Sequence, residues 1–253
     1  MTLLSPTGSL SPEVVPPLAV RELASGIDAL YLSGRARLSE SLLSRLELGK
    51  SRAQASGEPV PFEFGGVGFE LAPHGLGRYA YRLEHEHGLI GLTGSRRLPA
   101  VRVQLRAGFI HGLGAQAAAQ AFVDLLGTGL GQVELTVSRV DLFGDFQGWL
   151  FAAEDRTRFV TRATHRGTFG EHGELRGLLF GRRRGGALSA RIYDKTAEMA
   201  ATGATWLVDE WGAAYQPGQR VLRVEFEFGR TVFRELGVNT LDDLFDKLGG
   251  LWA

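Results

Sequence analysis

Three segments of the chain alternate charged and apolar residues with a period of two, and their charged positions could together carry out chemistry on a phosphate. In a β-strand, residues i, i+2 and i+4 share one face. The three charged faces then hold Arg139, Asp141, Phe143 and Asp145, next Ser189, Arg191, Tyr193 and Lys195, and last Arg223, Glu225 and Glu227. An open sheet covered on one side predicts such alternation in any case. For one strand alone, the simplest interpretation is a solvated face with cross-strand ion pairs.

Three of these positions carry carboxylates that could converge if the segments are neighbouring strands. They are Asp141, Glu225 and Glu227. Carboxylate oxygens suit hard divalent cations, so this face predicts a site for Mg²⁺ or Mn²⁺.

Tyr193 lies between two cationic residues of its own predicted face, Arg191 and Lys195. A tyrosine oxygen can attack phosphorus while cations and a metal stabilise the charge on the phosphate oxygens. A free phenol has a pKa of about 10, so Tyr193 would need the metal or a base to become nucleophilic. The alternative interpretation is a strand aromatic with a buried ring and a hydrogen-bonded hydroxyl.

A run of arginines between glycines comes just before the strand of Tyr193. Arg182, Arg183 and Arg184 stand between Gly181 and Gly185, in a window, 156–191, with nine arginines against two glutamates. Guanidinium groups fork onto phosphates, and glycines allow close approach to a polyanion. The run therefore predicts contacts to DNA, against the alternative of an exposed hairpin tip kept soluble by charge.

The composition restricts the class of protein. The chain has 253 residues, 28 basic and 28 acidic side chains, and no cysteine, which excludes disulfides, zinc–thiolate sites and cysteine nucleophiles. The sequence has no apolar run of about 18 residues, so we expect no membrane span. Residues 1–17 lack a basic region and contain four prolines before Leu18, unlike a signal peptide. We expect a cytoplasmic protein.

The periodicity predicts an α+β fold, a mainly antiparallel sheet with helices on one face, in two loosely similar strand–helix halves. We expect a flexible arm at 1–20, a meander-plus-helix half at 21–130 and a catalytic half at 131–253. The predicted strands are 27–33, 60–64, 66–71, 79–84, 88–93, 101–109, 132–143, 164–169, 175–180, 187–194 and 220–228. The predicted helices are 39–55, 115–126, 149–161, 204–213 and 241–251.

Other motifs in the chain are weaker. Gly49-Lys50-Ser51 imitates the end of a P-loop but lies late in a predicted helix. The glycines at 112 and 114 resemble a dinucleotide fingerprint, although the antiparallel meander before them does not suit one. His85 and His87 could share a strand face as metal ligands, but Glu86 between them does not suit the core position that such a pair needs, so solvated histidines at a strand end are the favoured interpretation. We therefore assign no cofactor-binding site beyond the divalent metal.

Three segments together resemble a known family. RVDLFGDF (139–146), LLFGRRRGGALSARIYDK (178–195) and LRVEFEF (222–228) occur in the order and spacing of the replication initiation factors of rolling-circle plasmids and phages. The family also includes relaxases of some integrative conjugative elements. The specific match covers roughly 132–230. The first half fits the family only loosely.

The resemblance implies that Tyr193 nicks one DNA strand at an origin, stays joined to the 5′-phosphate and later rejoins the strand. It places Asp141 and Glu225, with Glu227 two residues on, at metal-binding positions, and Arg191 and Lys195 at phosphate-binding positions. The implied partners are single-stranded or supercoiled origin DNA, a host helicase and a second copy of the chain, with no membrane. The chain ends soon after the last motif, whereas family members commonly continue, so a truncated C-terminus is one interpretation.

Two functions of different class stay open on the sequence. The first is the nicking and joining enzyme, either a replication initiator or a conjugative relaxase with the same chemistry. The second is a module of the same fold that binds DNA or dimerises without cutting. They differ in whether Tyr193 faces the carboxylates or lies in the core, and its shared face with Arg191 and Lys195 favours the enzyme.

Overall fold

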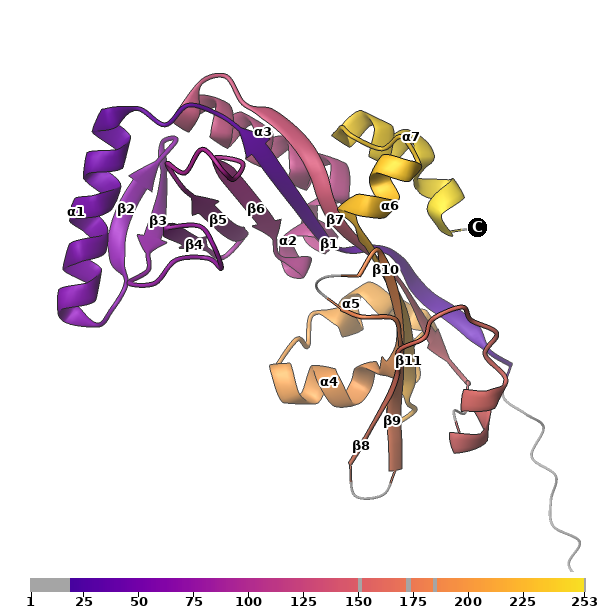
Figure 1. Ribbon diagram of the computed structural model, residues 1–253. Coiled ribbons are helices and arrows are strands. Elements are labelled where there is room, and N and C mark those ends of the chain that lie inside the picture. The colour runs from indigo at the N-terminus through magenta and orange to yellow at the C-terminus, as the bar shows by residue number, and fades with distance from the viewer. Residues whose placement is uncertain (1–18, 150–151, 172–173, 184–185, 253) are drawn as a thin grey trace, which may run out of the picture.

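One antiparallel sheet runs through the whole molecule. The structure is a computed structural model, and it describes residues 19–149, 152–171, 174–183 and 186–252. In these residues eleven strands pair in the order β2-β3-β4-β5-β6-β1-β7-β11-β10-β9-β8 (Figure 1). The fold is α+β, as the periodicity predicts. The predicted N-terminal arm lies, except for its last two residues, outside the described residues.

The strands of the first half are β1 and a meander of β2 to β6; the sequence predicts the meander strands closely, but it predicts only 27–33 of β1. Their bounds are β1 Arg21–Arg35, β2 Val60–Phe64, β3 Val67–Leu71, β4 Tyr81–His85, β5 Gly88–Leu92 and β6 Val101–Leu105. The strands of the second half are β7 Glu134–Gln147, β8 Arg166–Glu171, β9 Glu174–Phe180, β10 Leu188–Asp194 and β11 Val221–Gly229.

The longest strands, β1 and β7, pair with each other at the centre of the sheet. β1 also pairs with β6, and β7 also pairs with β11. The meander and the strands with the three motifs therefore belong to one continuous sheet rather than to two separate ones.

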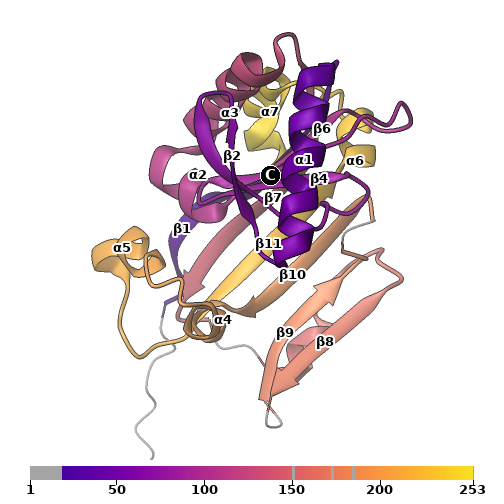
Figure 2. The ribbon, with the colours of Figure 1, turned by 90° about the vertical axis from the view of Figure 1, so that its left-hand side faces the viewer.

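Four of the helices cover one face of the sheet. They are α1 Glu40–Ser56, α3 Ala115–Leu130, α6 Arg230–Glu235 and α7 Leu241–Trp252. In Figure 1, α3, α6 and α7 lie above the strands, and α1 packs on β2 and β3 at the left-hand end, which faces the viewer in Figure 2. The main core lies beneath them, with Leu30, Val103, Val140 and Phe233 among its fully buried residues. None of the helices in the described part of the chain has the length and hydropathy that a bilayer span requires.

The remaining helices lie at the ends of the strands. α2 Ala107–Leu113 follows β6 and contacts β1. α4 Lys195–Thr202 and α5 Leu207–Trp211 lie on the opposite side of the sheet from α6 and α7 (Figure 1). The prediction of helices on one face thus holds for α1, α3, α6 and α7, while α4 and α5 cover one end of the other face.

Helix α1 follows the rules of its sequence closely. The Ser39 hydroxyl accepts a hydrogen bond from the Leu42 N–H at 3.2 Å, and Gly57 ends the helix at φ 77°. A serine N-cap and a left-handed glycine at the end are the signals that predict these bounds.

Two of the predicted elements are wrong in part. Residues 152–161 contain only a short 3₁₀ turn, Ala153–Thr157, instead of a helix. The Asp155 carboxylate accepts a hydrogen bond from the Ala152 N–H at 2.9 Å, and such local bonding competes with a helix. The predicted strand 101–109 ends at Leu105, and α2 begins two residues later. Because α2 precedes the Gly114 turn, the strand–turn–helix context of a dinucleotide fingerprint is absent there.

Candidate functional site

The three motif strands are neighbours, with β11 between β10 and β7. Their register aligns the charged faces in cross-strand rows. The rows are Tyr193–Arg223–Asp145, Arg191–Glu225–Phe143 and Ser189–Glu227–Asp141. The structure therefore brings Tyr193, Arg191 and the three predicted carboxylates onto one face of the sheet. Lys195 lies on the helix that follows β10, with its ammonium near the Tyr193 ring.

Tyr193 turns its hydroxyl toward a carboxylate. The Tyr193 O–H donates a hydrogen bond to Glu225 Oε2 at 3.1 Å, and the residue is only 8% exposed. The Arg191 guanidinium lies 4.7 Å from the centroid of the Tyr193 ring. Tyr193 thus has features of both interpretations that the sequence leaves open: its ring is buried, as in a core aromatic, and its oxygen faces a carboxylate, as in a nucleophile.

The surroundings keep the Tyr193 phenol protonated. Burial and, after it, the negative charge of Glu225 raise the pKa of Tyr193, while Arg223 and Arg191 lower it by less. A buried phenolate beside a carboxylate is unfavourable, so the proton must leave during any attack by the oxygen.

Lys195 lies at a different place from the one predicted. It is the first residue of α4 and not part of β10, because the Asp194 side chain accepts a hydrogen bond from the Ala197 N–H at 2.9 Å and caps the helix. Its ammonium lies 5.8 Å from the centroid of the Tyr193 ring and 2.5 Å from Glu198 Oε2. The side chain therefore still flanks Tyr193, from the helix that follows the strand.

The carboxylates of the site are paired with arginines. Arg191 forms an ion pair with Glu225, its cross-strand partner. Arg139 Nε donates a hydrogen bond to Asp141 Oδ1 at 2.7 Å, and its Nη2 lies 2.9 Å from Glu227 Oε2. Burial and the nearby Glu225 and Glu227 carboxylates raise the pKa of Asp141 to about 6, although Arg139 lowers it.

A divalent metal does not fit this arrangement of the side chains. Asp141, Glu225 and Glu227 have the right chemistry, since hard cations take oxygen ligands. However, Arg139 and Arg191 already bind their oxygens, and no three or more His, Asp or Glu side chains in the described residues are grouped to hold a metal. The requirement for Mg²⁺ or Mn²⁺ therefore stays a prediction of the family resemblance.

The arginine-rich hairpin between β9 and β10 lies beside this cluster. Arg183 Nε is 3.7 Å from Glu227 Oε2, and Arg182 is exposed to solvent. Arg184, the third predicted DNA-binding residue, lies outside the described residues. The hairpin thus brings at least one arginine to the edge of the cluster that holds Asp141 and Glu227.

A second buried network adjoins the site. Arg223 is fully buried and binds Asp145 with two hydrogen bonds of 2.7 Å, and it also pairs with Asp28 of β1. Trp211 of α5 donates a hydrogen bond to Asp145 Oδ2 at 2.8 Å. This network fixes the strand row that contains Tyr193.

His111 extends the same network to α2. Its Nδ1 lies 2.6 Å from Glu210 Oε1 of α5, and its Nε2 lies 3.5 Å from Asp28 Oδ1. Burial lowers the pKa of His111, but the two carboxylates outweigh burial and raise it overall. The sequence shows Asp145 and Arg223 on the charged faces, but it gives no spacing that would link them to Asp28, His111 or Glu210.

The comparisons with known proteins are few. No family model matches the chain, and no curated protein has a matching sequence. Among solved structures, the chain is similar to the rolling circle replication initiator protein from Geobacillus stearothermophilus, with 12% identity over 83% of this chain and 75% of that chain, at a TM-score of 0.44. The roles of the site residues therefore rest on their geometry and their motifs.

Proposed function

We propose that the protein nicks and rejoins one strand of DNA at an origin, as a replication initiator that uses Tyr193 as its nucleophile. The observation that carries this proposal is the hydrogen bond from the Tyr193 hydroxyl to Glu225, on a sheet face where arginines gather. A nucleophile bonded to a base, with cations around it, is the arrangement that attack on a phosphodiester needs.

The cutting step is a transfer between two oxygens. Tyr193 Oη attacks phosphorus, the bond to the 3′-oxygen breaks, and the 5′-phosphate becomes a phosphotyrosine. Glu225 accepts the phenol proton and returns it to the solvent, and the 3′-oxygen takes a proton from water and leaves as a hydroxyl. Because the phosphotyrosine keeps most of the energy of the broken bond, the reverse step rejoins the strand without a nucleoside triphosphate.

The cations around Tyr193 would neutralise the phosphate. Arg191 and Lys195 lie against its ring, and Arg182 and Arg183 come from the neighbouring hairpin. For Arg191 to turn to a phosphate, it must exchange its bond to Glu225 for one to the substrate. That exchange would free Glu225 to act as the base.

The metal requirement has its own test. The family resemblance implies that adduct formation needs Mg²⁺ or Mn²⁺ near Asp141, Glu225 and Glu227, and such a metal would require Arg139 and Arg191 to release these carboxylates. Adduct that forms equally well in excess EDTA would contradict this requirement and leave the acid–base step above unaffected.

A covalent-adduct assay tests the proposed function. The protein is mixed with fluorescent single-stranded oligonucleotides from its native locus, with Mn²⁺ present, and run on a denaturing gel. We expect a slow labelled protein band that is lost in Tyr193→Phe. The matched control is Tyr81→Phe, since Tyr81 is 8% exposed and its hydroxyl also donates to a glutamate, Glu47, at 2.8 Å.

The burial of Tyr193 favours a second candidate, a DNA-binding module that does not cut. In that case the arginine–carboxylate pairs only stabilise the fold, and the Tyr193 hydroxyl only supplies a hydrogen bond to the buried Glu225 carboxylate. Wild-type protein that binds the oligonucleotides and never forms the labelled band would select this candidate. A conjugative relaxase has the same chemistry as the initiator and would form the same band.

A further inference from the structure

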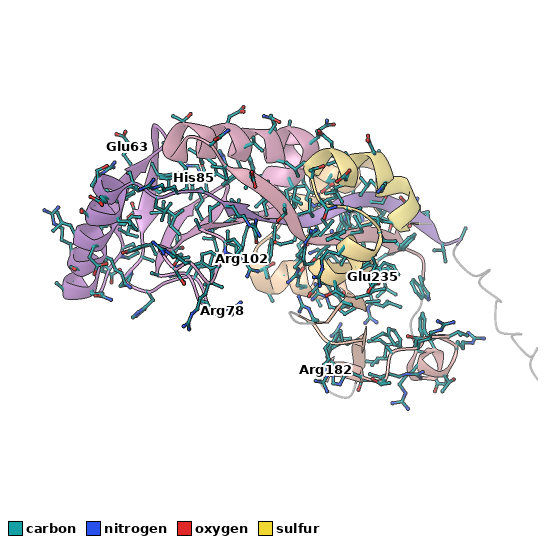
Figure 3. The ribbon with its side chains drawn as sticks, turned by 45° about the horizontal axis from the view of Figure 1, so that its top comes forward. Glu63, Arg78, His85, Arg102, Arg182 and Glu235 are labelled. Atoms are coloured by element: carbon teal, nitrogen blue, oxygen red, sulfur yellow. The ribbon has the colours of Figure 1, made fainter. Side chains whose placement is uncertain are left out.

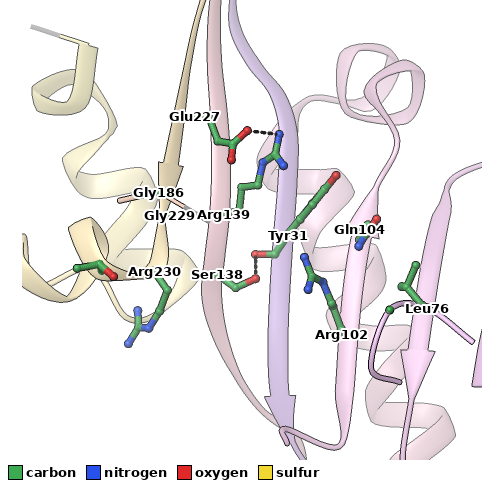
Figure 4. A pocket seen from close by; sticks show the side chains of 12 residues that line it. Tyr31, Leu76, Arg102, Gln104, Ser138, Arg139, Gly186, Glu227, Gly229 and Arg230 are labelled. Carbon is green, nitrogen blue, oxygen red and sulfur yellow. Dashed lines mark hydrogen bonds and ion pairs between the residues drawn. The ribbon is translucent and has the colours of Figure 1, made fainter. Parts of the chain in front are cut away.

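An open groove crosses the sheet face next to the cluster of Arg139 and Glu227. Its volume is about 680 Å³, and it crosses β6, β1, β7 and β11 (Figure 4). The side chains that define its floor include Tyr31, Arg102, Gln104, Ser138 and Arg139. Four neighbouring strands span roughly 14 Å, which is longer than a single phosphate group.

Arginine side chains dominate the charge of this groove. Arg139 and Arg102 both lie against the Tyr31 ring, with their guanidinium carbons 4.9 and 5.5 Å from its centroid. Arg139 is engaged with Asp141 and Glu227. By contrast, the buried Nε of Arg102 has no hydrogen-bond partner in the described part of the chain.

Arg230 adds a third cation to the groove wall. Its guanidinium donates to the carbonyl oxygens of Val137 and Val238 and to the Asn239 side chain, all of which are uncharged. The charged residues that line the groove are three arginines, Arg102, Arg139 and Arg230, and one acidic residue, Glu227. The groove therefore carries a net positive charge and favours an anion.

The groove continues into other basic parts of the surface. Gly186 of the arginine-rich hairpin lines one end, and Leu76 and Gly77, next to the exposed Arg78, line the other. Figure 3 shows Arg78 and Arg102 on the part of the molecule formed by the meander, and Arg182 on the hairpin below the central strands. A path with cations at both ends and in the middle suits a chain of phosphates better than one isolated anion.

The groove is also close to the nucleophile. Glu227, in its wall, is two residues from Glu225 on β11, a separation of about 7 Å in a strand. Glu225 accepts the hydrogen bond of the Tyr193 hydroxyl. A DNA strand that lies in the groove would therefore reach Tyr193 within about one nucleotide of its path.

We propose that this groove holds the backbone of the single-stranded DNA beside the bond that Tyr193 cuts, with Arg102 binding a phosphate and Tyr31 positioning Arg102. The assignment rests on the proposed function, because it names the path of that substrate. It adds a binding surface from the first half of the chain, in which the family motifs are absent.

Fluorescence anisotropy with a labelled single-stranded oligonucleotide tests the assignment. We expect Arg102→Gln to weaken binding roughly tenfold through the loss of a charge-assisted phosphate contact. The slope of log affinity against log salt should fall by about 0.7 for the one lost contact. Arg102→Lys should recover part of the affinity, because it keeps the charge and loses the planar fork.

The matched control is Arg52→Gln, the same change of charge on the exposed side of α1, which packs on the other face of the sheet. It should bind as the wild type does. Thermal unfolding of each variant shows that the fold is intact. Three results would overturn the assignment. Arg102→Gln could bind with the same affinity as the wild type, Arg102→Gln and Arg52→Gln could lose the same affinity, or the wild type could fail to bind DNA.

The adduct assay on the same preparations separates the two proposals. If wild type forms the Tyr193 adduct and Arg102→Gln binds normally, the groove assignment fails and the cutting function stands. If Arg102→Gln binds weakly and wild type forms no adduct, the groove stands as a DNA-binding surface and the cutting function fails.

Discussion

At the residue scale, the central feature is a buried phenol, Tyr193, whose hydroxyl donates a hydrogen bond to a carboxylate, that of Glu225. Burial and the charge of Glu225 raise the pKa of Tyr193, so free phenolate is scarce at neutral pH. The Glu225 carboxylate lies within hydrogen-bond reach of the proton that must leave. Geometry of this kind is the first requirement of a general base.

Replacing this base should remove most of the reaction. We expect Glu225→Gln to slow adduct formation by about 100-fold or more, because the amide cannot accept the proton. Single-turnover rates at saturating DNA measure the effect, with circular dichroism to establish folding. The control is Glu47→Gln, which removes the carboxylate bonded to Tyr81. A wild-type rate in Glu225→Gln would show that another group takes the proton.

At the element scale, the position of Tyr193 depends on its neighbouring strands. Tyr193 pairs with Arg223 on β11 and with Gly177 on β9, and the Phe169 ring of β8 occupies the space beside Gly177. A side chain at position 177 would meet that ring and would lie 2.7 Å from the Ile192 carbonyl oxygen. The glycine is therefore required for the close approach of β8, β9 and β10.

We expect Gly177→Ala to destabilise the fold by roughly 1–3 kcal/mol through this overpacking. Urea unfolding measures the change. Gly167→Ala on β8 is the matched control, since a Cβ there would meet Leu179 at an ordinary 3.5 Å. Similar losses in the two variants would contradict a specific role for the contact at Gly177.

The helices α2 and α5 are joined through a titratable side chain. His111 of α2 bonds Glu210 of α5 and approaches Asp28, and its pKa is raised in the folded protein. A raised folded pKa means that the contribution of His111 is complete below its unfolded pKa of about 6.5 and is lost as pH rises through the folded value.

The stability of the wild type should therefore fall between about pH 6 and about pH 9 by more than that of His111→Gln. The free energy of unfolding in urea at the two pH values measures the difference. Equal changes in the two proteins would mean that His111 gains no proton affinity on folding. The basic groups near this histidine include Arg223, which pairs with Asp28 at every pH in this range.

The sequence predicts the strands well and the contacts between distant segments poorly. Period-two alternation placed Arg191, Tyr193 and Glu225 on faces that the register brings together. The same rule placed Lys195 on the strand, because it takes no account of the Asp194 cap that starts α4 there. The Arg223–Asp28 pair joins residues 195 positions apart, and only the order of strands in the sheet brings them together.

At the scale of the whole molecule, the cationic groups follow a path across one face of a nearly neutral protein. Arg102, Arg230 and Arg183 lie along the groove or at its end. Binding through arginine–phosphate contacts releases counterions, so it depends on salt and not on a metal.

We therefore expect the affinity for single-stranded DNA to fall steeply with salt, with a log–log slope of about −2 for three phosphate contacts. We also expect the affinity to be unchanged in EDTA. Anisotropy titrations over a range of salt concentrations measure both. Affinity that is insensitive to salt, or lost on removal of divalent metal, would contradict binding by these arginines.

The most direct test of the central claim is to locate the covalent bond itself. Wild-type protein is reacted with single-stranded DNA, digested with nuclease and protease, and analysed by mass spectrometry. The account predicts a nucleotide joined through phosphate to Tyr193, in the peptide that also contains Ile192 and Asp194. A nucleotide on any other residue, or an unmodified Tyr193 in protein that has cut the DNA, would contradict it.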